Sequence, residues 1–122
     1  MTEDSKYIKG KILVAIKRGK KHFKEIVDET KFSANTITKY TRELEKDGLI
    51  IIELDRNLMK LVYKLNKAKM DEINKLINAY LEHEKKELKE KMEFVMHYIE
   101  FTEEEKKEIA ELMEKLKKKF GL

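Results

Sequence analysis

Hydrogen-bond donors gather on one side of a short stretch between residues 33 and 46. At helical spacing, Ile37, Tyr40, Thr41 and Leu44 share one side of this stretch. The other side carries an amide, two hydroxyls and two cations, on Asn35, Thr36, Thr38, Lys39 and Arg42. Groups of this kind hydrogen-bond base edges and phosphates. The stretch therefore predicts a nucleic-acid-binding helix rather than a catalytic site.

Each donor has an expected role in this helix. Ser33 is placed to cap its start, and a helix N-terminus attracts phosphate. We expect Ser33, Asn35, Thr36 and Thr38 to reach bases or phosphates. Further along, Arg42 can take a guanine in a bidentate contact and Lys39 a phosphate. The alternative is an ordinary exposed helix in a domain that binds another protein.

The neighbouring segments predict how this helix is held. Apolar spacing predicts a helix over residues 5–18, in which Gly10 marks a close helix crossing, and a second over residues 23–30. A tight connection, 31–33, leads into the donor-bearing helix, which Gly48 ends. Two β-branched and apolar runs around a turn at 55–57 then predict a β-hairpin. Three helices followed by a hairpin is the winged-helix order.

The string FKEIVDETKFSANTITKYTRELEKDGLI resembles prokaryotic winged-helix regulators of the MarR, ArsR and PadR kind. The matching positions are Ile26, Val27, Ile37, Leu44, Gly48, Leu49 and Ile50, whereas Thr41 stands where the family often has Leu or Val. With the two helices that apolar spacing predicts after residue 65, the expected fold is mainly α with a small β-hairpin, a winged helix-turn-helix followed by a long helix and a shorter last helix. The resemblance implies the winged helix-turn-helix part of this fold. It also implies DNA-dependent transcription regulation.

The net positive charge lies in the first half of the chain. Residues 1–65 hold 15 Lys and Arg against 10 Asp and Glu, and residues 66–122 hold 13 against 14. We expect Lys20 and Lys21 to contact phosphates, and Arg56 and Lys60 of the 54–60 wing to approach the backbone or the minor groove. The alternatives are a solvated face of a Lys-rich protein and a structural hairpin with an incidental arginine.

The second half predicts a partner-binding extension. One helix over 66–100 and another over 102–120, with a capping box at Thr102 and Glu105, are amphipathic but too long for a small core. We therefore expect a winged-helix domain at 1–65 and a homodimerisation extension at 66–122. The expected interface residues are Ile73, Ile77, Tyr80, Leu88, Met92, Val95, Ile99, Leu112 and Leu116.

Other chemistries find little support in the residues. The chain has no Cys, which excludes disulfides and thiolate sites, and no phosphate loop or catalytic triad can be read, so we expect neither an enzyme nor a cofactor. His83 with Glu87, or His97 with Glu93, could form metal half-sites, but surface His among Lys and Glu is the usual case, and no metal is expected. Tyr80, Met92, Met96 and Tyr98 could line an effector pocket, although Met and aromatic residues at helical spacing more often belong to a core.

The N-terminal sequence and the composition predict where the protein acts and what kind of organism it comes from. The N-terminus lacks the apolar run of a signal peptide and no 18-residue apolar segment exists, so we expect a cytoplasmic protein with no membrane partner. Charged residues reach 43%, mostly Lys and Glu, which is typical of a thermophilic, archaeal source. The predicted function is a homodimeric regulator that binds double-stranded DNA through the helix at about 34–46. The alternative is a winged-helix adaptor that binds another protein.

Overall fold

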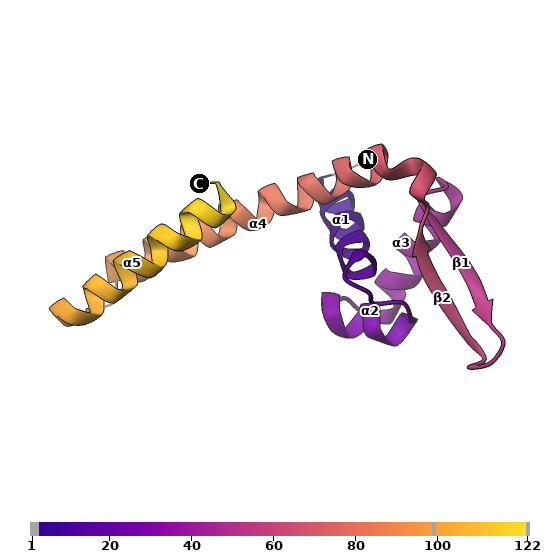
Figure 1. The fold of residues 1–122 in the computed structure, drawn as a ribbon, viewed down its shortest axis with the longest axis horizontal. Coiled ribbons are helices and arrows are strands. Elements are labelled where there is room, and N and C mark those ends of the chain that lie inside the picture. The colour runs from indigo at the N-terminus through magenta and orange to yellow at the C-terminus, as the bar shows by residue number, and fades with distance from the viewer. Residues whose placement is uncertain (1–2, 99, 122) are drawn as a thin grey trace. The chain divides into compact units, whose positions relative to one another are not determined.

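The computed structural model describes residues 3–98 and 100–121, and the chain divides into two compact units, Met1–Leu81 and Glu82–Leu122. Figure 1 shows the order of the elements. They are α1 Glu3–Lys17, α2 Phe23–Thr30, α3 Ala34–Lys46, β1 Ile50–Asp55, β2 Lys60–Leu65, the short 3₁₀ helix η1 Lys67–Lys69, α4 Met70–Tyr98 and α5 Glu103–Phe120. Among the described residues, no helix is long and apolar enough to cross a membrane.

The first unit packs α1, α2 and α3 against the base of the hairpin. Its core is formed by residues from every one of these elements and from the start of α4. Those with no exposed surface are Ile12, Leu13, Ile26, Ile37, Leu44 and Ile73. The predicted apolar stripes of the first three helices therefore face one another, which fixes the direction in which each helix turns its polar side.

The turn between α2 and α3 is short because the chain reverses at one residue. Lys31 adopts the left-handed conformation at φ 65°, and its N–H donates to the Val27 carbonyl to close α2. Ser33 then begins α3. The predicted tight connection is confirmed, and it gives the helix-turn-helix geometry.

The hairpin, here called the wing (residues 50–65), has an apolar face turned toward the helices. Antiparallel register pairs Ile50 with Leu65 and Ile52 with Tyr63 on this face. The Tyr63 N–H donates to the Lys21 carbonyl at 2.8 Å, which ties β2 to the loop before α2. The wing is thus anchored at its base, and its outer part extends beyond the core.

The start of α4 belongs to the first unit, which extends past the predicted domain boundary at residue 65. A Cβ added to Gly10 would lie 2.3 Å from the Leu76 carbonyl oxygen and 2.6 Å from Tyr80 Cβ, so the predicted close crossing at Gly10 is confirmed. Ile73 and Ile77 lie in the core of this unit at 0% and 6% exposure. Both were predicted as dimer contacts, and they are instead already covered within the chain, because α1 packs on this turn of α4.

The second unit pairs the last part of α4 with α5. Thr102 caps α5 through the predicted capping box with Glu105, and Gly121 ends it at φ 70°. Apolar residues of the two helices surround a small hollow of about 200 Å³. They are Met92, Val95, Ile109, Leu112, Met113 and Leu116. The predicted mainly helical fold with one hairpin, a long helix and a shorter last helix is confirmed.

Candidate nucleic-acid interface

The start of α3 is built by two hydroxyl side chains. Ser33 Oγ accepts the Thr36 N–H at 3.2 Å and lies 2.9 Å from Thr36 Oγ1. Both residues were predicted to reach bases or phosphates. In the structure their hydroxyls bond to one another, and the Ser33 hydroxyl caps the helix. Asn35 lies beside them with an exposed side chain. The capped start of α3 therefore presents the Asn35 side-chain amide outward.

The rotation of α3 is set by its buried side. Ile37, Thr41 and Leu44 are at most 2% exposed. Thr41 fits on this apolar side because its hydroxyl donates to the Ile37 carbonyl oxygen at 2.6 Å. The same hydroxyl lies 3.3 Å from the Thr38 carbonyl oxygen. A threonine with its hydroxyl bonded to its own helix fills a core position without an unpaired polar group.

The opposite side of α3 carries the predicted donors, here called the donor face: Asn35, Thr38, Lys39 and Arg42. Asn35, Lys39 and Arg42 are exposed, and Thr38 is half-buried. Lys39 Nζ lies 5.2 Å from the centre of the Tyr40 ring, which steadies the ammonium over an aromatic face. The sequence placed these four residues on one exposed side, and the structure does so as well.

A groove separates the donor face from the wing. It has a volume of about 630 Å³ and brings together Thr38 and Arg42 of α3 with Lys60 of β2. Lys24 of α2 and Glu45 of α3 also line it, and its apolar lining includes Phe23, Ile52 and Leu61. Three cations and one carboxylate give this groove a positive rim, which suits a phosphate chain.

Tyr63 lies in this groove, and the pKa of its phenol is raised above its usual value by burial and, to a lesser degree, by the negative charge of Glu45. The phenol therefore stays neutral across the physiological range. His22 lies nearby, with Nδ1 3.2 Å from the Leu61 carbonyl oxygen. This contact between His22 and the wing was not predicted, since 39 residues separate His22 from Leu61.

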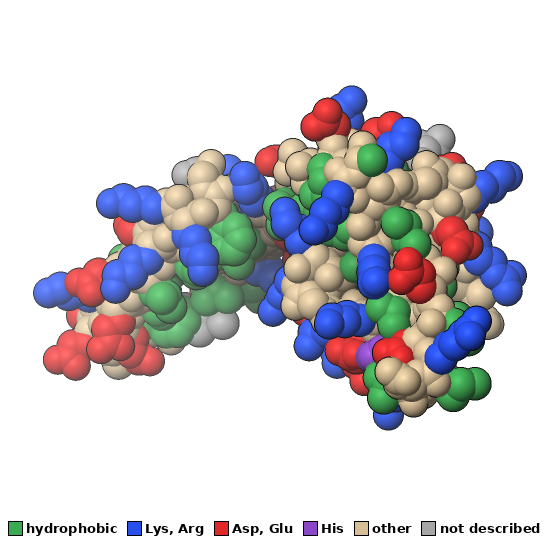
Figure 2. Space-filling view, turned by 45° about the vertical axis from the view of Figure 1, so that its right-hand side comes forward, with side chains coloured by type: hydrophobic (Ala, Val, Ile, Leu, Met, Phe, Trp, Pro, Cys, Tyr) green, Lys and Arg blue, Asp and Glu red, His purple; other side chains and the backbone are tan. Residues whose placement is uncertain are grey.

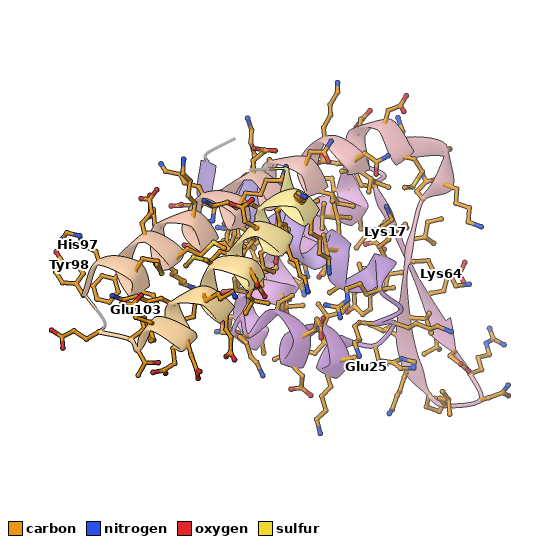
Figure 3. The ribbon with its side chains drawn as sticks, turned by 60° about the vertical axis from the view of Figure 1, so that its left-hand side comes forward. Lys17, Glu25, Lys64, His97, Tyr98 and Glu103 are labelled. Carbon is orange, nitrogen blue, oxygen red and sulfur yellow. The ribbon has the colours of Figure 1, made fainter. Side chains whose placement is uncertain are left out.

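A second hollow, of about 730 Å³, lies where the wing meets the end of α1. Its cations include Lys17 and Lys64, both labelled in Figure 3, and Lys21. Two carboxylates, of Glu53 and Asp55, share it. Of the two lysines predicted to contact phosphates, Lys21 is exposed and lines this hollow, and Lys20 beside it is half-buried. Neither lines the groove beside α3.

The turn of the wing carries Arg56 and ends at Lys60, and both side chains are exposed. Asp55 Oδ1 accepts the N–H groups of Asn57 at 3.0 Å and Leu58 at 3.2 Å, which holds the turn in one conformation. The predicted wing residues are therefore presented on an ordered turn.

The remaining predicted interface residues lie on α4 and α5. Tyr80 packs against Tyr7 in the first unit, with ring centres 5.4 Å apart. In the second unit, Leu88, Val95 and Leu116 are half-buried and Met92 is buried, whereas Leu112 is 58% exposed. Ile99 lies outside the described residues. The large apolar side chains that this unit exposes include Phe94, Met96 and Tyr98.

The four residues considered for an effector pocket lie in different parts of the structure. Tyr80 belongs to the first unit, and Met92 lies in the hollow between α4 and α5. Met96 and Tyr98 are exposed, and Tyr98 projects from the end of α4 beside His97 (Figure 3). The four side chains therefore do not share one environment.

Of the residues considered for a metal, His83 and Glu87 come together, with Glu84 beside them. Possible ligand atoms of His83, Glu84 and Glu87 lie within 4.8 Å of one another on α4. His83 Nε2 is 3.9 Å from Glu87 Oε1, with both side chains nearly half exposed. Oxygen and imidazole donors of this kind fit a zinc ion, although exposed His and Glu at this spacing also form ordinary ion pairs.

The chain is similar to known proteins in its three-dimensional fold and not in its sequence. No protein-family model matches the chain, and no curated protein matches its sequence. Among solved structures, the zinc-responsive MarR family member ZitR of Lactococcus lactis matches at 20% identity and a TM-score of 0.59, over 93% of this chain and 74% of ZitR.

Two structures of Staphylococcus aureus MepR also match. MepR, a transcription regulator of the multidrug efflux pump MepA, gives 16% identity and a TM-score of 0.53, over 89% of this chain and 75% of MepR. The MepR–DNA complex matches at 18% identity and a TM-score of 0.51, over 95% of this chain and 76% of MepR. At these identities the likeness concerns the fold, and the chain therefore has the winged-helix fold of these MarR-type structures.

Proposed function

We propose that this chain is a sequence-specific, DNA-binding transcription regulator that acts as a homodimer. The observation that carries the proposal is the donor face of α3, which is exposed opposite a fixed apolar side and borders a groove with a cationic rim. A helix with amide, hydroxyl and guanidinium groups on one exposed side is the element that reads base edges in the major groove.

The contacts follow from the positions of the side chains. With α3 in the major groove, Arg42 takes a guanine, Asn35 reads bases near the helix start, and Lys39 pairs with a phosphate. The groove between α3 and the wing then accommodates the sugar-phosphate backbone between Arg42 and Lys60. Arg56 reaches the flanking minor groove or backbone.

The comparisons support this assignment at the level of fold. MepR is described as a transcription regulator and was crystallised with DNA, and ZitR is described as a zinc-responsive MarR family member. The positive charge of residues 1–65 supports it independently, because binding to a polyanion requires such an excess. Nothing in the described residues resembles the polar, inward-facing cluster of a catalytic site.

The homodimer is supported by the apolar surface of the second unit. Phe94, Tyr98 and Leu112 are 58–69% exposed, and the rings of Phe94 and Tyr98 lie 4.8 Å apart on successive turns of α4. An exposed aromatic pair is costly in water and is typical of an interface. Pairing of two copies would set two recognition helices about 34 Å apart, one turn of a palindromic site.

The test of function is selection of duplexes from random DNA with the purified protein, followed by affinity measurement at several salt concentrations. We expect a defined, two-fold symmetric site and an affinity that falls steeply with salt. Absence of DNA binding at low salt, together with a specific protein recovered in a pulldown, would favour the adaptor alternative.

The test of oligomeric state is light scattering at micromolar concentration. The wild type is expected to have twice the mass of the chain. The double variant Phe94→Ser, Tyr98→Ser is expected to be monomeric, whereas Lys86→Ser, an exposed polar change on the same helix, is expected to stay dimeric. A monomeric wild type would contradict the homodimer.

A further inference from the structure

The outer part of the wing is apolar on its surface. Leu54 and Leu61 pair across the strands at 52% and 48% exposure, and Leu58 and Met59 in the turn are 57% and 74% exposed. These four residues are here called the tip cluster. Figure 2 shows hydrophobic side chains at this end of the first unit, among Lys and Arg side chains. Such a gathering on a protruding turn marks an interaction site.

Folding does not account for the tip cluster. The apolar face of the wing is buried at Ile50 and Tyr63, close to the helices, and continues outward to Leu54 and Leu61, where no core lies beneath it. Met59 adopts φ 52°, a conformation that favours glycine. Neither burial nor backbone geometry therefore favours methionine at this position.

The charges around the tip cluster indicate what that partner is. Arg56 and Lys60 flank Leu58 and Met59 with exposed cationic side chains. The nearby acids are engaged: Asp55 accepts two N–H groups of the turn, and Glu53 lies 2.9 Å from Lys64 Nζ. Lys60 also lines the groove beside Arg42, so the cationic rim continues from α3 to the tip. An apolar tip between two cations complements a groove between two phosphate chains.

We propose that the tip cluster is a wedge that enters the minor groove of bound DNA. Met59, with Leu58 beside it, presses between two adjacent base pairs and partly unstacks them, while Arg56 and Lys60 hold the phosphates on either side. The duplex then bends away from the wing, as DNA does when apolar side chains of architectural proteins enter its minor groove. This inference rests on the proposed DNA-binding function and adds a mode of readout, because flexible TA and CA steps unstack most easily.

The test uses the full chain and a selected duplex with 2-aminopurine at the wing-proximal step and fluorophores at both ends. The test variants are Met59→Gly, which suits the backbone at φ 52°, and Leu58→Ser with Met59→Gly. The matched control is Ile51→Ser, which removes a 42% exposed apolar side chain from the same hairpin, away from the tip. Thermal unfolding of each protein verifies that it is folded, and Met59→Gly is expected to melt no lower than the wild type.

Wild type and Ile51→Ser are expected to raise 2-aminopurine fluorescence and to bring the duplex ends closer. The double variant is expected to lose both signals and to bind about tenfold more weakly. Equal fluorescence and bending for wild type and double variant would overturn the wedge while leaving DNA binding intact. A tip variant that changes the oligomeric state but not the DNA signals would also overturn it, in favour of a protein contact. Absence of DNA binding by the wild type would overturn the proposed function as well.

Discussion

Lys9 Nζ lies 3.4 Å from Glu43 Oε2, which joins α1 to the third turn of α3. The Lys9 side chain is 6% exposed and that of Glu43 is 44% exposed. An ammonium removed from water in this way depends on its partner, because its charge is costly to leave unpaired. The pair therefore holds α3 against the helix that also crosses α4 at Gly10.

Glu43→Gln is expected to lower the free energy of unfolding by about 1–2 kcal/mol, because the buried Lys9 ammonium keeps only a neutral partner. Lys9→Met, which removes the buried charge at similar volume, is expected to change it by less than about 1 kcal/mol. Urea unfolding of both single variants and of the double variant measures the coupling. A larger loss for Lys9→Met than for Glu43→Gln would contradict this account.

Gly10→Ala is expected to destabilise the first unit by about 2 kcal/mol, although alanine favours helix by about 1 kcal/mol. The added Cβ would meet the Leu76 carbonyl oxygen at 2.3 Å, so the α1–α4 crossing must open. Urea unfolding measures the loss.

The control for Gly10→Ala is Gly48→Ala. A Cβ added to Gly48 would have no atom within 4 Å, so that only the φ of 77° opposes the substitution. Its loss is expected to be smaller, about 1 kcal/mol. If Gly10→Ala were as stable as wild type, the close crossing would be excluded.

The local parts of the fold could be predicted because their signals lie within a few residues. Ser33 and Gly48 bound α3, and Thr102 with Glu105 caps α5, since a cap and its helix are adjacent in sequence. Helical spacing also identified the buried side of α3. These features required no knowledge of which elements pack together.

The rest depends on contacts between distant residues. Helical spacing shows that Ile73 and Ile77 have a buried side but not which surface covers it, so both were assigned to a partner and lie in the chain's own core. Lys9 was counted only among the 15 Lys and Arg of residues 1–65, and its burial follows from the packing of α1 on α3. The groove of Lys24, Arg42 and Lys60 joins three elements that local patterns cannot place together.

Tyr63 predicts a loss of stability in alkali. Its pKa is raised by burial and by Glu45, so the unfolded chain releases the phenolic proton first. The contribution to stability is present below about pH 10, the usual tyrosine value, and is lost as the pH rises through the raised value. Between pH 8 and pH 11, the wild type is therefore expected to lose more unfolding free energy than Tyr63→Phe. Equal losses in parallel urea titrations would show that Tyr63 does not titrate differently in the two states.

Zinc is expected to leave the melting temperature unchanged, because His83, Glu84 and Glu87 lie on one helix and His83 and Glu87 are exposed to water. Differential scanning fluorimetry with equimolar Zn²⁺ measures this, and His83→Ala is the matched control. A rise in melting temperature that His83→Ala abolishes would contradict the expectation and would indicate a metal response.

Arg42 and Lys39 are expected to act differently on DNA, although both are cations of the donor face. Arg42→Ala is expected to weaken the selected site by about 1–3 kcal/mol and to relax preference at one base pair, because a guanidinium can bond a guanine edge in two places. Lys39→Ala is expected to weaken all duplexes alike and to lower the salt slope by about one, since it removes a phosphate contact. Lys75→Ala, an exposed change on α4, is the control for general loss of charge. Gel-shift titrations at several salt concentrations separate the roles, and a double variant with unchanged affinity would remove α3 from the DNA interface.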